Sequence, residues 1–366
     1  MSGERLKVGV IGCGAIAMNA HLPSYAKLPD LVKIQAVADI HEGRAKAAAQ
    51  LYGVPEVFTD YRDMLVNADI DMVSVCTPNS LHAQQTIAAV RAGKHVLCEK
   101  PMATSLEDSR AMIEAAKQAG VTLMVGFTHR YFNFNRKARE YIQKGLIGQP
   151  MMMRVRFAHN GPYLSWSAMS DSFFEPELAG GGALLDMGIH AIDLCRYFGG
   201  DVTSVMAKTA TLGKDISVED WAVGILEFRN PKLLAYFEVG WSSQPGPLGV
   251  EIYGTEGTLV ADYVTPLRVY KNKTGLDGRG WILPENVGGG GWDAEVANFV
   301  RSILGKEEPL ATAEDGYESL KIALAAYESS EKGVKVTLVD TSKSGTTHGE
   351  EGFSLPAPND CHVAAD

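Results

Sequence analysis

The sequence predicts an α/β protein in two parts. A doubly wound parallel sheet comes first, and an α/β domain with a large, mostly antiparallel open sheet follows. The first 127 residues alternate short apolar runs with helix-forming stretches, which is typical of parallel strands joined by crossover helices. From residue 151 onward, long β-rich runs are separated by tight turns, which indicates antiparallel strands. We therefore expect domains at 1–127 and 128–340, and a loose tail at 341–366 that carries few apolar residues.

The first strand is expected at residues 8–11, a β-branched apolar run that breaks into the sequence GCGAIA at residues 12–17. An alanine-rich stretch follows, so the order is strand, glycine turn, helix. This G-x-G-x-x-A pattern is the fingerprint of a dinucleotide-binding (Rossmann) turn. Gly12 permits the tight turn, Gly14 lets a pyrophosphate approach the backbone, and Ala17 lets the helix pack closely on the strand.

The cofactor predicted from this turn is NAD. Ala15 and Ile16 begin the helix, so their N–H groups face the expected phosphates. A second apolar run, residues 34–38, ends at Asp39, about twenty residues beyond the glycines, as the fold requires. A carboxylate there accepts hydrogen bonds from both ribose hydroxyls and repels a 2′-phosphate. Arg44 weakens this preference and leaves NADP as an alternative. A glycine turn in another kind of α/β protein is the competing interpretation.

The rest of the N-terminal domain continues the alternation. Helices are expected at residues 43–52, 61–66, 82–91 and 106–119, the last with Ser105 as N-cap and Gly120 just after it, and strands at 57–58, 72–76, 95–98 and 121–127. Polar segments follow three strands: Thr77-Pro78-Asn79, Glu99-Lys100-Pro101 and Thr128-His129-Arg130. Ligands of such sheets bind beyond the carboxyl ends of the strands. We expect the first two segments to contact the cofactor, with His82 nearby.

The second part begins with an expected strand at 151–159. A helix at 183–197 follows, entered through three glycines. Further strands are expected at 203–212, 221–228, 233–241, 250–253, 258–261 and 334–339, closing helices at 293–304 and 313–332, and an irregular glycine-rich segment at 275–291. This order predicts an antiparallel sheet with one face covered by helices.

Composition excludes several classes of protein. A net charge of −10 argues against a nucleic-acid or anionic-membrane surface. Five widely spaced cysteines without C-x-x-C indicate buried free thiols in a reducing compartment, and nine histidines without ligand spacing indicate no metal site. The first strand follows MSGERLK directly, which leaves no room for a signal peptide, and we expect no apolar run of membrane-spanning length. These observations predict a cytoplasmic protein.

Three motifs resemble the Gfo/Idh/MocA oxidoreductases, a family that includes inositol dehydrogenases and glucose–fructose oxidoreductase. They are the glycine-rich turn, Glu99-Lys100-Pro101, and the sequence GGGALLDMGIH at 180–190, and the resemblance covers residues 5 to about 340. It implies a Rossmann domain followed by an α/β domain whose open sheet often forms the subunit interface. A homodimer or homotetramer is therefore expected.

The same resemblance assigns the chemistry. Asp186 and His190 lie four apart on an expected helix and share a face. A histidine titrates near neutrality, which suits a base that takes a hydroxyl proton while hydride leaves the same carbon. The resemblance implies His190 as base, Lys100 as its polar partner and Asp186 as an orienting or substrate-binding group, with Asn79 at the nicotinamide end. A plain i,i+4 helix pair is the competing interpretation of Asp186 and His190.

Substrate contacts are expected from the catalytic residues and from the segment 159–176. Its His159, Tyr163 and Trp166 suit the polar and apolar faces of a sugar, although a loop that packs its own aromatics fits too. Arg130 has two equal interpretations, substrate binding or pairing with a carboxylate. Two departures from the family leave the substrate open. Phe173-Phe174 stands where a tryptophan is frequent, and Thr128-His129-Arg130 stands where an asparagine often precedes the arginine.

The sequence thus predicts a NAD(P)-dependent oxidoreductase. It would move hydride between nicotinamide and a ring carbinol of a sugar, inositol or related polyol. One alternative is a redox-neutral glycosidase, in which NAD transiently oxidises and then re-reduces the sugar. The other is a non-catalytic cofactor-binding regulator, against which the presence of Lys100, Asp186 and His190 argues.

Overall fold

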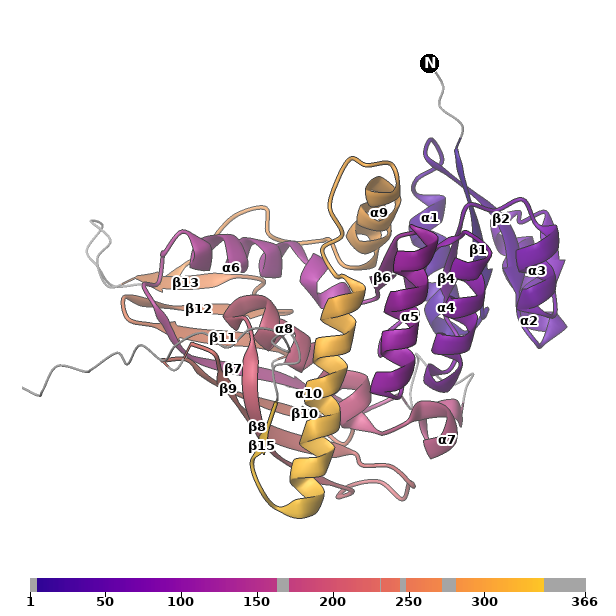
Figure 1. Cartoon of the computed structure of the whole chain (residues 1–366). Helices are drawn as coiled ribbons and strands as arrows, with labels where there is room; N and C mark the ends of the chain where they lie inside the picture. Colours follow the sequence, from indigo (N-terminus) through magenta and orange to yellow (C-terminus); the bar gives the residue numbers. More distant parts are fainter. Residues whose placement is uncertain (1–4, 163–170, 231, 244–247, 272–280, 339–366) are drawn as a thin grey trace, which may run out of the picture.

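Two sheets form the framework of the protein (Figure 1). The computed structural model describes residues 5–162, 171–230, 232–243, 248–271 and 281–338. Over these residues one sheet has six strands, all before residue 127, and the other has nine strands, all after residue 149. The two-part α/β architecture predicted from the sequence is confirmed.

The strands of the first sheet all run parallel, in the order β3-β2-β1-β4-β5-β6. They are β1 Leu6–Ile11, β2 Val32–Ala38, β3 Glu56–Phe58, β4 Met72–Val75, β5 His95–Cys98 and β6 Leu123–Val125. The central strand β4 is buried throughout, because helices cover both faces. The strand order turns between β1 and β4, which is where doubly wound sheets bind their ligands.

Helices join these strands. They are η1 Ala17–His21, α1 Leu22–Ala26, α2 Glu42–Tyr52, α3 Tyr61–Asn67, η2 Asn79–Leu81, α4 His82–Arg91 and α5 Leu106–Ala119. The predicted ends of α5 are confirmed. The Ser105 hydroxyl accepts the Asp108 N–H at 3.1 Å, and Gly120 ends the helix in a left-handed conformation. Helix η1 is a π turn, which no sequence pattern indicated.

The second sheet is mostly antiparallel, as predicted; of its strand pairs in the described residues, only β7 and β10 pair in parallel. Its order is β14-β13-β12-β11-β7-β10-β9-β8-β15. The strands are β7 Pro150–Ala158, β8 Val202–Ala210, β9 Trp221–Phe228, β10 Leu234–Gly240, β11 Gly249–Gly254, β12 Gly257–Asp262, β13 Arg268–Lys271, β14 Trp281–Ile282 and β15 Val336–Thr337. Strand β14 lies in the segment 275–291, which was expected to be irregular. The sequence did not predict this strand, because two residues are too few to show a period-two pattern.

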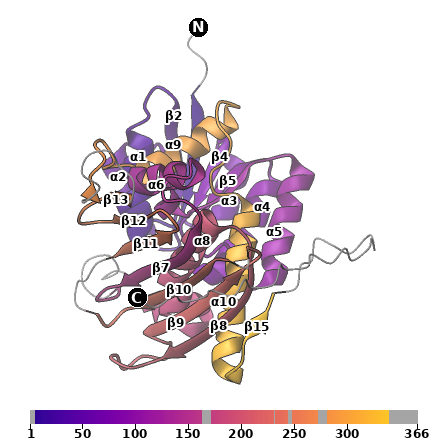
Figure 2. The ribbon, with the colours of Figure 1, turned by 90° about the vertical axis from the view of Figure 1, so that its left-hand side faces the viewer.

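Helices cover one face of this sheet (Figures 1 and 2). The helical elements beyond residue 127, not all of which lie on this sheet, are η3 Thr128–Tyr131, α6 Asn133–Gln143, η4 Asp171–Phe173, α7 Pro176–Ala179, η5 Leu184–Gly188, α8 Ile189–Gly199, α9 Trp292–Ile303 and α10 Ala313–Lys332. Helix α8 packs on β7 and β10, and α10 packs on β8. Helix α6 has no counterpart among the predicted helices, although Phe134, Ala138 and Tyr141 recur at helical spacing.

The last part of the chain returns to the N-terminal domain. Helix α9 packs against α1, and α10 packs against α5. The Val125 N–H donates to the Ala311 carbonyl at 3.2 Å, so the end of β6 is joined to the segment before α10. The two sheets are thus separate in the chain, with β6 ending at Val125 and β7 beginning at Pro150, while helices of the C-terminal part pack on the N-terminal one.

One continuous helical run, Pro176–Gly199, has the length and apolar composition of a membrane-spanning helix. This corrects the expectation that no run reaches such a length. The run comprises α7, η5 and α8, and 72% of its apolar window is buried inside the fold. It also carries Asp186, His190 and Asp193, so it is the core helix of the second domain.

Candidate active site

The glycine-rich turn has the shape that a dinucleotide requires. Gly12 has a φ of +88°, and a Cβ there would lie 2.7 Å from the Cys76 carbonyl oxygen. A Cβ on Gly14 would meet no atom within 4 Å. The backbone at Gly14 therefore borders open space at the N-terminal end of the helix that follows, where a pyrophosphate fits. The residues present thus fit NAD.

Asp39 lies at the end of β2, beside this turn. One of its carboxylate oxygens accepts the Cys13 N–H and the other accepts the His41 N–H, both at 2.8 Å. Two backbone donors fix the carboxylate at the mouth of the turn, so its remaining lone pairs can accept the ribose hydroxyls.

Lys100 and Asp186 come together at the boundary between the two sheets. The Lys100 Nζ lies 2.6 Å from Asp186 Oδ1 and 3.0 Å from the Asp186 carbonyl oxygen, and both side chains are largely buried. The indole N–H of Trp241 donates to Asp186 Oδ2 at 3.0 Å. Each carboxylate oxygen of Asp186 thus has its own donor, which fixes the ammonium group of Lys100 in the site.

His190 lies on α8, four residues beyond Asp186, and it is 5% exposed. Its Nδ1 is buried without a hydrogen-bond partner among the described residues. The Asp186 carboxylate is bound by Lys100 and Trp241, so the expected orienting contact from Asp186 to His190 does not form here. The π turn η5 contains Asp186 and changes the rotation between the two positions relative to a regular α-helix.

The surroundings of His190 hold its imidazole neutral. Burial, followed by the nearby His129 and Lys100, lowers the pKa of His190 well below its usual value. The His129 ring lies edge-on to it at a centroid distance of 4.3 Å. His129 in turn contacts the Tyr263 hydroxyl through Nδ1, and burial lowers the pKa of His129 to about 3. A neutral His190 is the form that accepts a proton.

The three glycines before the active-site helix are required by close packing. A Cβ on Gly180 would overlap the Thr104 side chain, one on Gly181 the Tyr327 hydroxyl, and one on Gly182 the Glu219 backbone. The Glu219 carboxylate also accepts the Gly182 N–H at 3.0 Å. Only residues without a side chain let the helix begin here, and this start sets the position of Asp186.

The two loops predicted to hold the cofactor are joined by His82. Its Nε2 lies 2.8 Å from the Thr77 carbonyl and its Nδ1 lies 2.8 Å from the Pro101 carbonyl. Burial lowers the pKa of His82, and the two carbonyl contacts oppose that shift. Asn79 donates to the Ala179 carbonyl at 2.8 Å, which connects the same loop to α7. His82 therefore connects the loop that follows β4 to the loop that follows β5.

Glu99 is buried below Lys100. Its carboxylate lies 2.9 Å from His21 Nε2 and accepts the Lys100 N–H at 3.1 Å. Burial alone would raise the pKa of Glu99, but the hydrogen bond and charge of His21, together with Lys100, lower it. Burial, together with the charge of Glu99, raises the pKa of Glu295 on α9 well above its usual range. Two acidic side chains are thus buried together in this part of the fold, with opposite pKa shifts.

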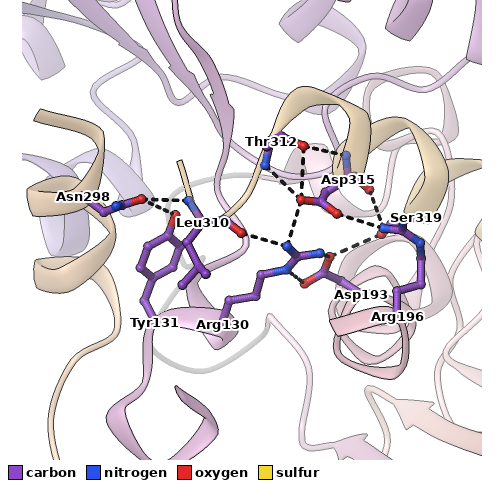
Figure 3. A network of polar contacts seen from close by, with 9 residues as sticks. All are labelled: Arg130, Tyr131, Asp193, Arg196, Asn298, Leu310, Thr312, Asp315 and Ser319. Atoms are coloured by element: carbon purple, nitrogen blue, oxygen red, sulfur yellow. Dashed lines mark hydrogen bonds and ion pairs between the residues drawn. The ribbon is translucent and has the colours of Figure 1, made fainter. Parts of the chain in front are cut away.

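Arg130 is bound by two carboxylates (Figure 3). It is 4% exposed, and its guanidinium lies 2.6 Å from Asp193 and 2.8 Å from Asp315. Burial alone would lower the pKa of Arg130, but the charges of Asp193 and Asp315 outweigh it and raise that pKa. Of the two interpretations of Arg130, this geometry favours pairing with carboxylates.

The predicted substrate segment is described in part. His159 directly follows β7 and lies close enough to Asp186 and Lys100 for their charges to affect its pKa. Burial is the largest influence and lowers the pKa of His159. Phe174 packs edge-on to Trp241 at 6.1 Å. Tyr163 and Trp166 lie outside the described residues. Cys13, Cys76, Cys98 and Cys195 are buried and free, as predicted, and the described residues contain no group of three or more side chains able to hold a metal ion.

Several residues of the site have no signal in the sequence. Trp241 follows β10, 55 residues from the aspartate that it binds. Tyr263 follows β12, 134 residues from His129. Neither belongs to a motif, so only the folded chain shows that they reach the site.

The fold and the site together define a class. A Rossmann domain with a dinucleotide turn, joined to a domain that brings a lysine, an aspartate and a histidine near it, is typical of NAD-dependent oxidoreductases. Residues 6–127 match the model of the oxidoreductase family with an NAD-binding Rossmann fold, and residues 135–260 match the GFO/IDH/MocA C-terminal domain. The chain belongs to the Gfo/Idh/MocA family, as its motifs predicted.

Relatives match along most of the chain. It is 34% identical to 1,5-anhydro-D-fructose reductase of Ensifer adhaerens, over 79% of this chain and 86% of the relative. It is 29% identical to myo-inositol 2-dehydrogenase of Thermotoga maritima, over 91% and 98%. Among solved structures, levoglucosan dehydrogenase with NADH and levoglucosan superposes with a TM-score of 0.83 at 29% identity, covering 91% of this chain and 99% of that one. The chain is thus an NAD-binding oxidoreductase of a family that acts on sugars and polyols.

Proposed function

We propose that the chain oxidises a ring carbinol of an uncharged cyclic polyol, a sugar or an inositol, with NAD as hydride acceptor. The observation that carries this proposal is the contact of 2.6 Å between Lys100 Nζ and Asp186, next to a neutral, buried His190. These groups follow β5 and begin α8, beside the loops that follow β1 and β4. A hydroxyl-bearing carbon held between Lys100 and His190 would face the cofactor cleft.

Each residue has a proposed role. Neutral His190 accepts the hydroxyl proton. The ammonium group of Lys100 stabilises the negative charge that develops on the hydroxyl oxygen. Asp186, fixed by Trp241, holds Lys100 in place and presents a carboxylate to a neighbouring substrate hydroxyl. NAD, when bound, supplies the nicotinamide C4 that accepts the hydride.

The cofactor and substrate class rest on separate observations. Gly12, Gly14, Ala15 and Ile16 would bind the pyrophosphate, and the fixed carboxylate of Asp39 favours NAD over NADP. The three relatives reported above are named for an anhydrosugar, an inositol and levoglucosan, which supports an uncharged sugar or polyol as substrate. We also propose a cytoplasmic location and a domain division at residue 127.

The test follows the absorbance of reduced nicotinamide with NAD or NADP and a panel of inositols, aldoses, anhydrosugars and glycosides. Continuous growth of the signal with one ring polyol is the expected result. His190→Asn and Lys100→Met are each expected to lower kcat by about 10²- to 10⁴-fold. His95→Asn is the matched control, because His95 begins β5 at the opposite end of that strand.

A redox-neutral glycosidase is the alternative that the same first step permits. It would consume a glycoside with no net change in nicotinamide absorbance, and it would retain NAD through turnover. Product analysis of the glycoside reactions separates the two activities. A non-catalytic regulator would turn over no member of the panel, and its His190→Asn variant would behave like the wild type.

A further inference from the structure

A pocket of about 520 Å³ lies behind the active-site helix, between α6, the end of α8 and the loop before α10. Among the described residues it is lined by four arginines, Arg130, Arg136, Arg139 and Arg196, and not by any residue proposed for catalysis. In a chain with a net charge of −10, these guanidinium groups reverse the sign of the charge locally. An anion can bind only to those arginines that do not already form an ion pair with a carboxylate.

Two of the arginines have acidic partners (Figure 3). Arg130 pairs with Asp193 and Asp315, and Arg196 lies 3.2 Å from the second oxygen of Asp315. Two guanidinium groups and two carboxylates therefore balance one another. Arg130 and Asp193 are almost fully buried, so this network forms a fixed wall of the pocket.

The other two arginines form no ion pair in the described part of the chain, although the charge of Arg136 helps to lower the pKa of Glu307, a carboxylate outside the pocket lining. Arg136 and Arg139 are three residues apart on α6 and lie on one face of it. Arg139 lies over the Tyr197 ring, with 4.1 Å between its guanidinium carbon and the ring centre. The ring holds this guanidinium in place but is uncharged, so it does not neutralise the charge of Arg139.

The remaining acids of the pocket are engaged elsewhere. Glu140 lies 2.9 Å from Lys137 and 2.6 Å from Lys144. Asp201 lies 3.1 Å from Arg229. Asp315 is shared by Arg130 and Arg196, as described above. The pocket thus has two guanidinium groups in excess and no lining carboxylate left to pair with them.

We propose that this pocket binds a small anion with at least two negative charges, with Arg136 and Arg139 as its ligands. Planar guanidinium groups bind phosphate and carboxylate oxygens in pairs, and such charge-assisted bonds are about twice as strong as neutral ones. A phosphate ester and a dicarboxylate share this chemistry. The bound anion has a short connection to catalysis, because Asp193, the partner of Arg130, follows His190 by three residues on α8.

Calorimetry on the NAD-saturated protein tests the proposal, since the cofactor then blocks the glycine-rich turn. The probes are inorganic phosphate and malonate, each compared with sodium chloride at equal ionic strength. Saturable binding of phosphate alone assigns a phosphate ester, and binding of malonate alone assigns a dicarboxylate. Binding of both supports the shared chemistry, and binding of neither overturns the proposal.

The variant Arg136→Gln/Arg139→Gln locates the binding. Each lost guanidinium is expected to raise the Kd about tenfold. Lys46→Gln/Lys332→Gln is the matched control, because it removes the same charge from exposed ion pairs outside the pocket. Unchanged affinity in the arginine variant would place the anion elsewhere and overturn the proposal. The single variant Arg136→Gln, at an exposed position, gives the same comparison should the double variant fold poorly.

Discussion

At the scale of single residues, the site depends on groups that fix other groups. Asp186 is the clearest case, because one of its carboxylate oxygens accepts a hydrogen bond from the Lys100 ammonium group and the other accepts one from the Trp241 indole N–H. The motifs of the sequence contain both Lys100 and Asp186, but their contact with each other was not predicted, because each was expected to act on His190 or on the substrate. Trp241 was not predicted as a site residue, because a residue that acts through tertiary contact alone leaves no local pattern.

Trp241→Phe removes the N–H donor and keeps an aromatic ring. Asp186 then has one donor fewer, so Lys100 is less well fixed, and we expect kcat/KM to fall about tenfold, the equivalent of about 1.4 kcal/mol. The affinity for NAD should stay unchanged. Steady-state kinetics with a substrate found in the panel measures both. Trp281→Phe, at an exposed position on β14, is the control. Unaltered kcat/KM in Trp241→Phe would show that its contact with Asp186 does not support catalysis.

His190 predicts the pH dependence of the reaction. Its pKa is lowered by burial, by His129 and by Lys100, so it stays neutral through the physiological range. As the pH falls, the base is lost only when the pH passes this lowered pKa. The acid limb of kcat/KM should therefore lie below about 6.5, the usual histidine value.

His129→Gln gives the matching test. The substitution removes one of the groups that lower the pKa of His190, so the acid limb should move to higher pH. Profiles of kcat/KM from acid to neutral pH measure both proteins. A wild-type limb at or above the ordinary histidine value would contradict a neutral, buried base.

At the scale of the elements, the glycines of the cofactor-binding turn and those before the active-site helix have different structural roles. At residues 180–182, Thr104, Tyr327 and Glu219 occupy the space that a side chain would need, so these glycines are required for close packing. Gly14 is the opposite, because its missing side chain leaves open space. The sequence predicted both motifs but not the residues that pack against Gly180–Gly182, since these come from three separate segments of the chain. It also missed the π turns η1 and η5, which no spacing announces.

Gly14→Ala separates the two roles. The added methyl group meets no atom of the protein, so the free energy of unfolding without cofactor should change by less than about 1 kcal/mol. The same methyl group would occupy the approach of the pyrophosphate, so the Kd for NADH should rise about tenfold or more. Fluorescence titration with NADH and thermal unfolding measure the two effects. Gly43→Ala, also in open space but on α2, should leave the affinity for NADH unchanged and should stabilise the fold by at most about 1 kcal/mol, because alanine favours a helix more than glycine. Equal NADH affinity in all three proteins would place the cofactor elsewhere.

At the scale of the whole molecule, the second sheet has one covered and one open face. The burial of β9 alternates strictly, so every second residue faces away from the helices. Met206 pairs with Ile225 across the sheet, and both are about half exposed, as is Val223. Alternation of this kind made the sheet predictable from the sequence. No described helix covers the other face, where Met206, Val223 and Ile225 are exposed.

We expect this open face to join copies of the chain, which is the homodimer or homotetramer that the family resemblance implies. The exposed Met206, Val223 and Ile225 form an apolar centre, and the ion pair of Arg156 with Glu238 at 3.0 Å lies beside it as a polar rim. An exposed apolar patch is stabilised by a partner surface of complementary shape, because burial of apolar surface contributes about 25 cal/mol per Å².

Light scattering after gel filtration measures the outcome. The wild type should elute as a dimer or tetramer. Met206→Asp/Ile225→Asp should elute as a monomer, because an interface that buries two carboxylates without partners is strongly disfavoured. Leu51→Asp, on the exposed surface of α2, should leave the assembly intact. A monomeric wild type at micromolar concentration would contradict the interface. A Met206→Asp/Ile225→Asp protein with unchanged mass would move it to another surface.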